Sequence, residues 1–441
     1  MDDDREEKRR GLRGWHVALG IVALLAALVV LLALTKRGGV ERRVEALRAQ
    51  GYPTSFAELA EQHQLPEGIE NAADVYLKAF AAFRPPTDKP NTIFIGQAQL
   101  PALGAPLSEA VAQATAQFLA DNQQCLELLR EAGQIEQCRY DWDFSQGTPP
   151  LSSVRQCAQL LVAAVVMRGQ QGDATAAIAC LQDELRLAQS LRHEPLLISY
   201  LVRVACTALS LRALEQTLSV MSFTDDQLVQ IDRILAEATA TLDLTEAMVT
   251  ERCFSIEAIR DPSRLGGGFT RALKIPGLRG LGMADILDYM ADCIEASDLP
   301  PHQRASRFRQ IRDEVGDLSF LHAVVKTLAP ALGRVAELDL RGRADLDLAR
   351  TALAIERYRL ATGQVPERLA ELVPQYLDTV PLDPFDGRPL RYRRTDAGYR
   401  LYSVMEDGQD NGGITRAEAN KGDPYDFSFT VNRQSGDTSR R

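Results

Sequence analysis

Apolar residues along this chain follow three successive patterns. Residues 15–34 form an unbroken apolar run, WHVALGIVALLAALVVLLAL, in which His16 is the one polar residue. Residues 38–335 place apolar side chains at helical spacings of three and four, and 390–431 contains short alternating stretches. The patterns predict a mainly α chain: an N-terminal transmembrane helix, an irregular helical-hairpin domain, and a small C-terminal α+β domain.

The apolar run is long enough to cross a bilayer, because a helix of its length spans roughly 30 Å. Five Lys or Arg residues precede it and five follow closely, so the positive-inside count does not decide its orientation. A cleaved secretory signal and a buried core helix are the alternatives, but the run is longer than a typical signal h-region, and the sequence LALTK at its end makes a poor small-residue cleavage site. We expect an uncleaved single-pass anchor in the cytoplasmic (inner) membrane, with 1–14 as a cytoplasmic tail and the bulk of the chain extracytoplasmic.

Helix caps and breakers organise the predicted helical domain. Ser108 is expected to cap a helix from Glu109 to about Glu131, and Thr224 is expected to cap a later helix. Stretches rich in Pro or Gly, or without periodicity, predict three loops. These loops are expected near 84–106, 133–150 and 261–282.

The strongest helical signal in the chain lies at 151–243. Alanines such as Ala158, Ala163 and Ala177 recur on two helices that flank Gly172, and such small residues allow close helix approach. This segment resembles one tetratricopeptide-like helical hairpin. Three in-phase copies cannot be found, so stacked irregular hairpins are expected in preference to a repeat array.

The last hundred residues change from helical to alternating patterns. A helix with one apolar stripe ends at Gly363, a short second helix begins near Pro366, and VPLDPFDGRP supplies tight turns. Strands are expected at 390–394, 399–404 and 426–431, the first two joined by a hairpin. The chain then ends in a tail, 433–441, that we expect to be disordered.

Residues 338–432 resemble the soluble domain of the major pseudopilins of type II secretion systems. The resemblance rests on ALAIERYRLATGQVPERLAEL, DPFDGRPLRYR and GYRLYSVMEDGQDNGG. It implies a helix packed on a short antiparallel sheet, and a calcium site in the loop after the second strand. Unlike a pseudopilin, this chain has no Glu in its apolar span, and residues 35–337 separate the span from the helix. We therefore expect this domain to share the pseudopilin architecture without assembling into a pilus-like fibre.

Six carboxylates crowd the stretch 406–426, which we call the acidic loop. Such a cluster repels itself unless it is solvated or neutralised by a cation, and calcium prefers oxygen ligands. Residues 407–418 also resemble a twelve-residue EF-hand loop, in which Glu418 would close the site; the pseudopilin resemblance favours Asp426 instead. A solvated acidic loop is the alternative. The predicted calcium ligands are Asp407, Asp410, Asn411, Glu418 and Asp426.

Other sequence features exclude classes of function without identifying one. A net charge of −10 argues against nucleic-acid binding, and the seven cysteines contain no CxxC pair. The five histidines are scattered, His193 is interpreted as a helix C-terminal cap, and no HExxH, GxSxG or Walker motif occurs. We therefore predict a non-enzymatic scaffold or binding protein of a bacterial cell envelope, with membrane lipid and another protein as partners and a link to secretion as one option. An envelope hydrolase with its site in the helical domain is the alternative.

Overall fold

A computed structural model describes most of the chain after the predicted anchor. The described residues are mainly helical, with a three-stranded antiparallel sheet near the C-terminus, which confirms the outline of the expected fold class. The predicted tail 1–14, the anchor 15–34 and residues 434–441 lie outside the described residues. The described ranges are 39–66, 68–141, 150–194, 196–261, 276–318 and 322–433.

Contacts between residues divide the chain into two compact units. We call them the smaller and the larger unit. Among the described residues, the smaller unit contains 39–62, 249–261, 276–294, 311–318 and 322–330. The larger unit contains the described residues of 63–248, 295–310 and 331–433. The expected boundary between 335 and 338 lies inside one long helix, and the division into a 38–335 and a 338–432 domain stays a prediction.

Residues of the smaller unit are helical throughout most of their described length. After a helix at 39–49 come α2 (Phe56–Gln62), most of α10 (Leu244–Arg260) and most of α12 (Pro276–Asp298). The unit also holds the end of α13 (Pro301–Asp317) and the start of α14 (Ala323–Thr362). Residues 276–282 of the loop expected near 261–282 are instead helical, because α12 begins at Pro276, a residue that favours the first helical turn; residues 262–275 lie outside the described residues.

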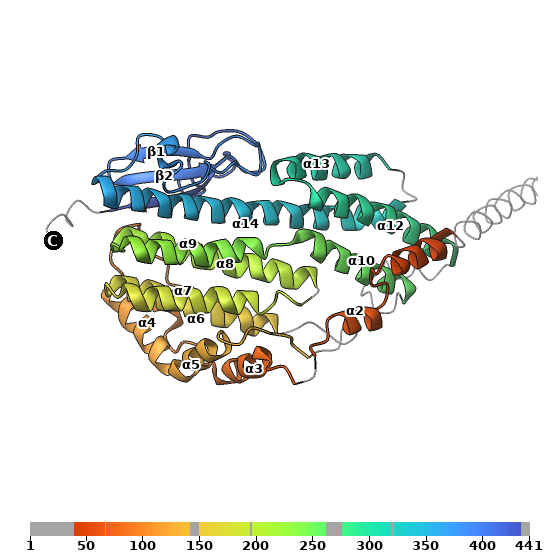
Figure 1. Ribbon diagram of the computed structural model, residues 1–441, viewed down its shortest axis with the longest axis horizontal. Coiled ribbons are helices and arrows are strands. Elements are labelled where there is room, and N and C mark those ends of the chain that lie inside the picture. The colour runs from red at the N-terminus through yellow and green to blue at the C-terminus, as the bar shows by residue number, and fades with distance from the viewer. Residues whose placement is uncertain are drawn as a thin grey trace, which may run out of the picture. The chain divides into compact units, whose positions relative to one another are not determined.

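The larger unit is built on stacked helices, and Figure 1 shows α6 to α9 and α14 running side by side. Arg350 and Arg357 of α14 pair with Asp232 and Asp225 of α9, each at 2.7 Å. The helices are α3 (Ala72–Ala82), α4 (Glu109–Asp121), α5 (Gln123–Ala132), α6 (Leu151–Gln170), α7 (Ala174–Gln189), α8 (Leu197–Val220) and α9 (Asp225–Ala240).

Helices α6 and α7 form the expected hairpin at 151–190. Gly172 has a φ of +74° in the turn, and Asp173 caps α7 by accepting a hydrogen bond from the Ala176 N–H. A Cβ at Gly169 would lie 2.7 Å from the Thr217 methyl group of α8. Glycine is therefore required where α6 crosses α8 closely.

Helix α8 is, among the described helices, the one long and apolar enough to cross a membrane. However, 67% of its apolar window is buried inside the protein. It packs against α6, α7 and the sheet, so its composition is that of a core helix. Packing inside the protein is therefore enough to explain why α8 is long and apolar.

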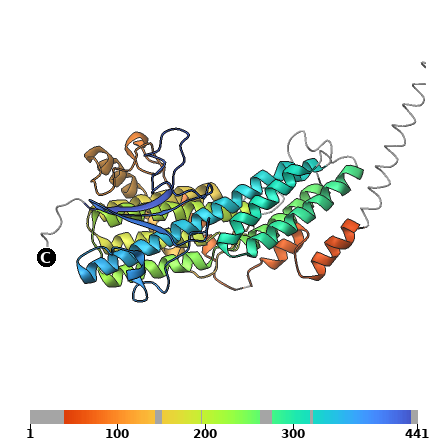
Figure 2. The same cartoon turned by 90° about the horizontal axis from the view of Figure 1, so that it is seen from above.

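The sheet consists of β1 (Arg391–Thr395), β2 (Gly398–Ser403) and β3 (Phe427–Asn432) in that order. Every end of the three strands lies within one residue of its predicted position. Figures 1 and 2 show the sheet against the end of α14, where the buried Tyr399 hydroxyl donates to the Ala352 carbonyl at 3.2 Å. The expected helix on a short antiparallel sheet is thus present, but α14 begins at Ala323 rather than near 338. A 3₁₀ turn, Leu369–Leu372, replaces the expected second helix.

The helix expected from Glu109 to about Glu131 is instead two helices, α4 and α5, which meet at Asn122. The side chain of Asn122 is buried and accepts a hydrogen bond from the Arg84 N–H at 2.8 Å. Its amide group donates in return to the Arg84 carbonyl at 2.9 Å. These hydrogen bonds to a residue 38 positions away interrupt the helix at Asn122, and the local sequence pattern does not predict them.

Candidate functional site

Asp426 is the residue around which the acidic loop is organised. Its side chain is buried, and Oδ2 accepts hydrogen bonds from the N–H groups of Asn411 at 3.0 Å and Gly413 at 2.7 Å. Its own N–H donates to the Ile414 carbonyl at 2.7 Å. A carboxylate at the start of β3 therefore holds the far side of the loop by backbone contacts.

Negative charge is concentrated around Asp410 and Asp426. Burial raises the pKa of Asp426, and the nearby Asp410 carboxylate raises it further, against the lowering effect of the two backbone donors. Burial also raises the pKa of Tyr402 to about 12, with added contributions from both carboxylates. Arg391 Nε lies 3.9 Å from Asp410 Oδ2, a long and weak contact.

Glu418 is turned away from that concentration of charge. Its two oxygens accept hydrogen bonds from the Arg400 guanidinium at 2.8 Å each, and one also accepts from the Thr415 N–H. The Arg400 hydrogen bonds hold the pKa of Glu418 at about 2. Asp407 is exposed and accepts from the Gln409 N–H in its own turn.

The structure thus brings three of the five predicted calcium ligands together and separates the other two. Asp410, Asn411 and Asp426 are neighbours, whereas Glu418 is paired with arginine and Asp407 faces solvent. Among the described residues, no group of three or more His, Cys, Asp or Glu side chains lies as a metal site would require. The EF-hand-like ligand set therefore needs Glu418 to leave Arg400 before it fits a cation.

The DPFDG turn is held by a second buried carboxylate, Asp383. It accepts hydrogen bonds from the Ser403 hydroxyl at 2.9 Å, the Val404 N–H at 2.9 Å and the Phe385 N–H at 3.0 Å. Arg391 of β1 pairs with it at 3.0 Å. These contacts tie the turn to β1 and β2, so the motif has a structural role.

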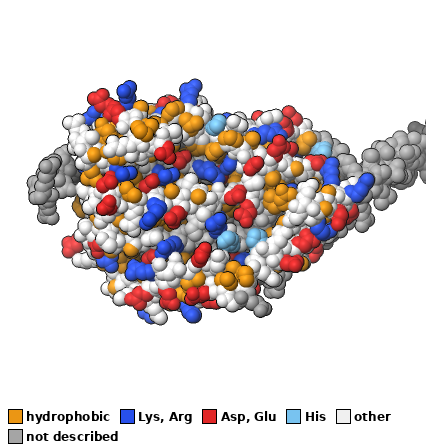
Figure 3. All heavy atoms as spheres, viewed as in Figure 1, with side chains coloured by type: hydrophobic (Ala, Val, Ile, Leu, Met, Phe, Trp, Pro, Cys, Tyr) orange, Lys and Arg blue, Asp and Glu red, His pale blue; other side chains and the backbone are white. Residues whose placement is uncertain are grey.

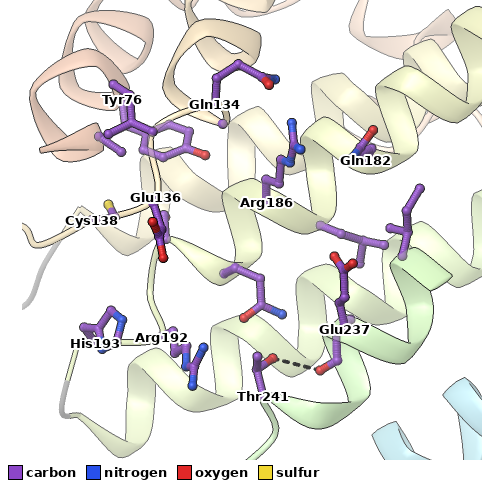
Figure 4. Close-up of a pocket in the computed structure, with 18 of the residues that line it drawn as sticks. Tyr76, Gln134, Glu136, Cys138, Gln182, Arg186, Arg192, His193, Glu237 and Thr241 are labelled. Atoms are coloured by element: carbon purple, nitrogen blue, oxygen red, sulfur yellow. Dashed lines mark hydrogen bonds between the residues drawn. The ribbon is translucent and has the colours of Figure 1, made fainter. Parts of the chain in front are cut away.

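A pocket of about 550 Å³ lies in the larger unit, between α3, α7, α9 and the segment 133–138. Figure 4 shows Arg186 of α7 and Glu237 of α9 beside the same space. Such a volume is within the usual range for small-molecule sites. Other polar residues that line it are Gln134, Glu136, Gln182, Gln189, Arg192 and His193.

A buried ion pair holds one wall of this pocket in place. Glu194 is fully buried and accepts from Arg139 Nη1 at 2.6 Å and from the Tyr140 N–H at 2.9 Å. Arg139 also donates to the His63 carbonyl at 3.0 Å. The pair ties the segment around Cys138 to the turn that follows α7, because the partners are 55 positions apart.

The pocket contains a thiol that is poorly suited to nucleophilic attack. Burial, with a further contribution from Glu194, raises the pKa of Cys138 to about 12, so the thiol is protonated at neutral pH. Burial also lowers the pKa of His193, whose ring is neutral. Among the described residues that line the pocket, no hydrogen bond joins His193 to Cys138 or to the Ser190 hydroxyl, which donates to the Leu187 carbonyl.

This pocket was not predicted from the sequence. His193 was expected to cap a helix, but α7 ends at Gln189 and the histidine lines the pocket instead. One local signal was available, because Gln182, Arg186 and Gln189 form a polar stripe at helical spacing on a helix that is otherwise largely buried. Such a stripe indicates that this side of α7 faces either solvent or a pocket, and the pattern alone does not distinguish the two.

Comparison with family models, curated proteins and solved structures finds no match to this chain. The resemblances to pseudopilins and to tetratricopeptide hairpins therefore stay predictions. On the face drawn in Figure 3, Lys and Arg side chains are interspersed with Asp and Glu. The pocket and the acidic loop are the two candidate sites of this chain.

Proposed function

We propose that this chain is a membrane-anchored binding protein of a bacterial cell envelope, with its body outside the cytoplasm and its ligand in the pocket of the larger unit. The observation that carries the proposal is a pocket of about 550 Å³ where charged and amide side chains surround a thiol that stays protonated. A cysteine hydrolase needs a thiol activated by a lowered pKa or a bonded base. Binding without chemistry needs neither.

The charges in the pocket indicate the class of ligand. Arg186 and Glu237 carry opposite charges and lie on different helices. Arg192 and Glu136 repeat the combination near the other end. A small zwitterion, such as an amino acid or a short peptide, presents a carboxylate to the arginines and an ammonium group to the glutamates.

An envelope hydrolase is the second candidate, since Cys138, Glu136 and His193 lie along the same side of the pocket (Figure 4). For catalysis, His193 would have to approach the Cys138 thiol and accept its proton. The raised pKa of Cys138 makes that step costly. This candidate is therefore second to binding.

We also propose that calcium orders the acidic loop, closed by Asp426 rather than by Glu418. The negative charge around Asp410 and Asp426 supports this choice, because a cation is attracted there. The bidentate pair between Arg400 and Glu418 argues against closure by Glu418. The pseudopilin resemblance suggests a protein partner in the envelope, alongside lipid contact through residues 15–34.

The test is a thermal-shift screen of the full chain in detergent micelles against amino acids and dipeptides of each charge type. Zwitterionic members are expected to raise the melting temperature, and Arg186→Gln is expected to remove the effect. Arg233→Gln is the matched control, because Arg233 is an exposed arginine on α9 outside the pocket. No shift with any member would contradict ligand binding. Release of free amino acids from the dipeptides, lost in Cys138→Ser, would favour the hydrolase.

A further inference from the structure

Two of the seven cysteines have their sulfur atoms in contact. Cys125 lies on α5 and Cys157 on α6, with 3.9 Å between the two Sγ atoms. Both side chains are fully buried, within one hydrophobic cluster of the larger unit. The contact therefore joins two helices through residues that are 32 positions apart in the chain.

The geometry requires little change to join them. A disulfide has its sulfurs about 2.05 Å apart, so the atoms must approach by roughly 2 Å. Each cysteine has a single side-chain torsion, and its rotation swings the sulfur over a distance of that order. The sulfur atoms are already in contact, so no other side chain has to leave the space between them.

The contact also makes the two thiols chemically different. Hydrogen bonding from Cys157 lowers the pKa of Cys125. The same contact and burial raise the pKa of Cys157. This difference belongs to the folded chain, where the two sulfur atoms touch.

We propose that Cys125 and Cys157 form a disulfide that links α5 to α6 when the chain folds in an oxidising compartment. The inference goes beyond ligand binding and rests on one part of the proposed function, the extracytoplasmic position of the body. Disulfides persist outside the cytoplasm and are rare within it.

The oxidant is the disulfide of a thiol–disulfide oxidoreductase, and it acts during folding, before the helices bury both thiols. The thiolate of either cysteine attacks one sulfur of that disulfide and releases the other as a thiolate. The thiolate of the second cysteine then attacks the chain's own sulfur in the mixed disulfide and expels the second enzyme thiolate. Two protons leave the chain's thiols, and two electrons reduce the enzyme disulfide to a dithiol.

The experiment is acid quenching of cells that contain the full chain, followed by denaturation at neutral pH with N-ethylmaleimide present, tryptic digestion and peptide mass spectrometry. We expect five alkylated cysteines and one linked pair. In that pair the tryptic peptide 156–168, which contains Cys157, is joined to the tryptic peptide that contains Cys125. Cys125→Ala should free Cys157 for alkylation. Cys206→Ala is the matched control, since Cys206 is equally buried in the same cluster, and it should leave the link intact.

A second arm separates failure of the pairing from failure of the extracytoplasmic placement. The purified, reduced chain is refolded in detergent with oxidised glutathione and mapped in the same way. A link formed only in this arm would overturn the placement while supporting the pairing. Seven free thiols, or a different linked pair, in both arms would overturn the pairing. Reduction of the linked chain is expected to lower its melting temperature by about 5 °C.

Discussion

The acidic loop and the pocket are both rich in charged groups, but they are built in opposite ways. The loop draws its carboxylates from 406–426, and most of their partners are backbone N–H groups of the loop or arginines of the neighbouring strands. The pocket draws its lining from residues spread over 72–241. Its polar side chains come from α3, the segment 133–138, α7 with the turn after it, and α9, which meet only in the folded chain (Figure 4).

The difference shows that density of charge along a sequence is a poor guide to a site. Glu418, one of the predicted closing ligands, is neutralised by Arg400, which comes from β2. Burial disfavours the charged form of the Asp426 carboxylate, and two backbone N–H donors stabilise that form. In the pocket some polar groups also have partners, since Gln189 accepts from Arg203 and Thr241 donates to the Ala238 carbonyl, while charged groups from different helices face one space.

The largest expected effect comes from removing the carboxylate that holds the loop. Asp426→Ala leaves the Asn411 and Gly413 N–H groups without their acceptor, and we expect a loss of about 4 kcal/mol in the free energy of unfolding. Urea titration measures it. The control is Asp423→Ala, since Asp423 is exposed and bonded to Asn420, and it should change stability by less than about 0.5 kcal/mol. Equal effects of the two variants would show that the loop is not organised around Asp426.

The second prediction concerns Glu184, on the buried side of α7, the helix that lines the pocket. It accepts a hydrogen bond from the Ser210 hydroxyl, its Oε1 has no hydrogen-bond partner, and burial raises its pKa to about 8. The folded state therefore binds a proton that the unfolded state has lost above pH 4.5. Stability should fall as the pH rises from about 4.5 through 8.

Glu184→Gln removes this titration. Relative to the wild type, the variant should gain about 3 kcal/mol between pH 5 and pH 8. Urea unfolding at the two pH values measures the difference, and Glu131→Gln, at an exposed position of α5, is the control. Parallel pH dependence in the wild type and the variant would mean that Glu184 is ionised in the fold.

The third prediction decides which carboxylate closes the proposed calcium site. Calcium at a hundred times its dissociation constant should stabilise the full chain by about 2.7 kcal/mol, measured by thermal unfolding in detergent. Asp410→Ala should abolish the effect, because Asp410 lies beside Asp426, whereas Glu418→Gln should retain it, because Glu418 is already paired with Arg400. Loss in Glu418→Gln would favour the EF-hand-like ligand set. A flat response in the wild type would leave a solvated acidic loop.

The smallest expected effect tests the pocket. For the zwitterion with the largest thermal shift, Arg186→Gln should raise the dissociation constant about tenfold, equal to about 1.4 kcal/mol, because one charge-assisted hydrogen bond is lost. Isothermal titration calorimetry measures it. Arg233→Gln should bind as the wild type does. A ligand whose affinity is unchanged in both variants binds elsewhere.

Local sequence signals were sufficient for most secondary structure. The strands followed from alternation between turn residues, and the three-stranded sheet has that register. Thr224 forms a capping box with Gln227, and Ser108 accepts from the Val111 N–H, as their positions before helices predict. These features depend on contacts between residues a few positions apart, which a sequence displays directly.

What the sequence determined by itself is therefore the mainly helical class, the hairpin at 151–190, the sheet and the presence of an acidic loop. Only the tertiary structure decided that Asn122 breaks a helix, that Glu418 pairs with Arg400 and that His193 lines a pocket. The reason is physical. Periodicity reports which face of a helix or strand is apolar, but the partner of a polar side chain is set by packing between segments far apart in the chain.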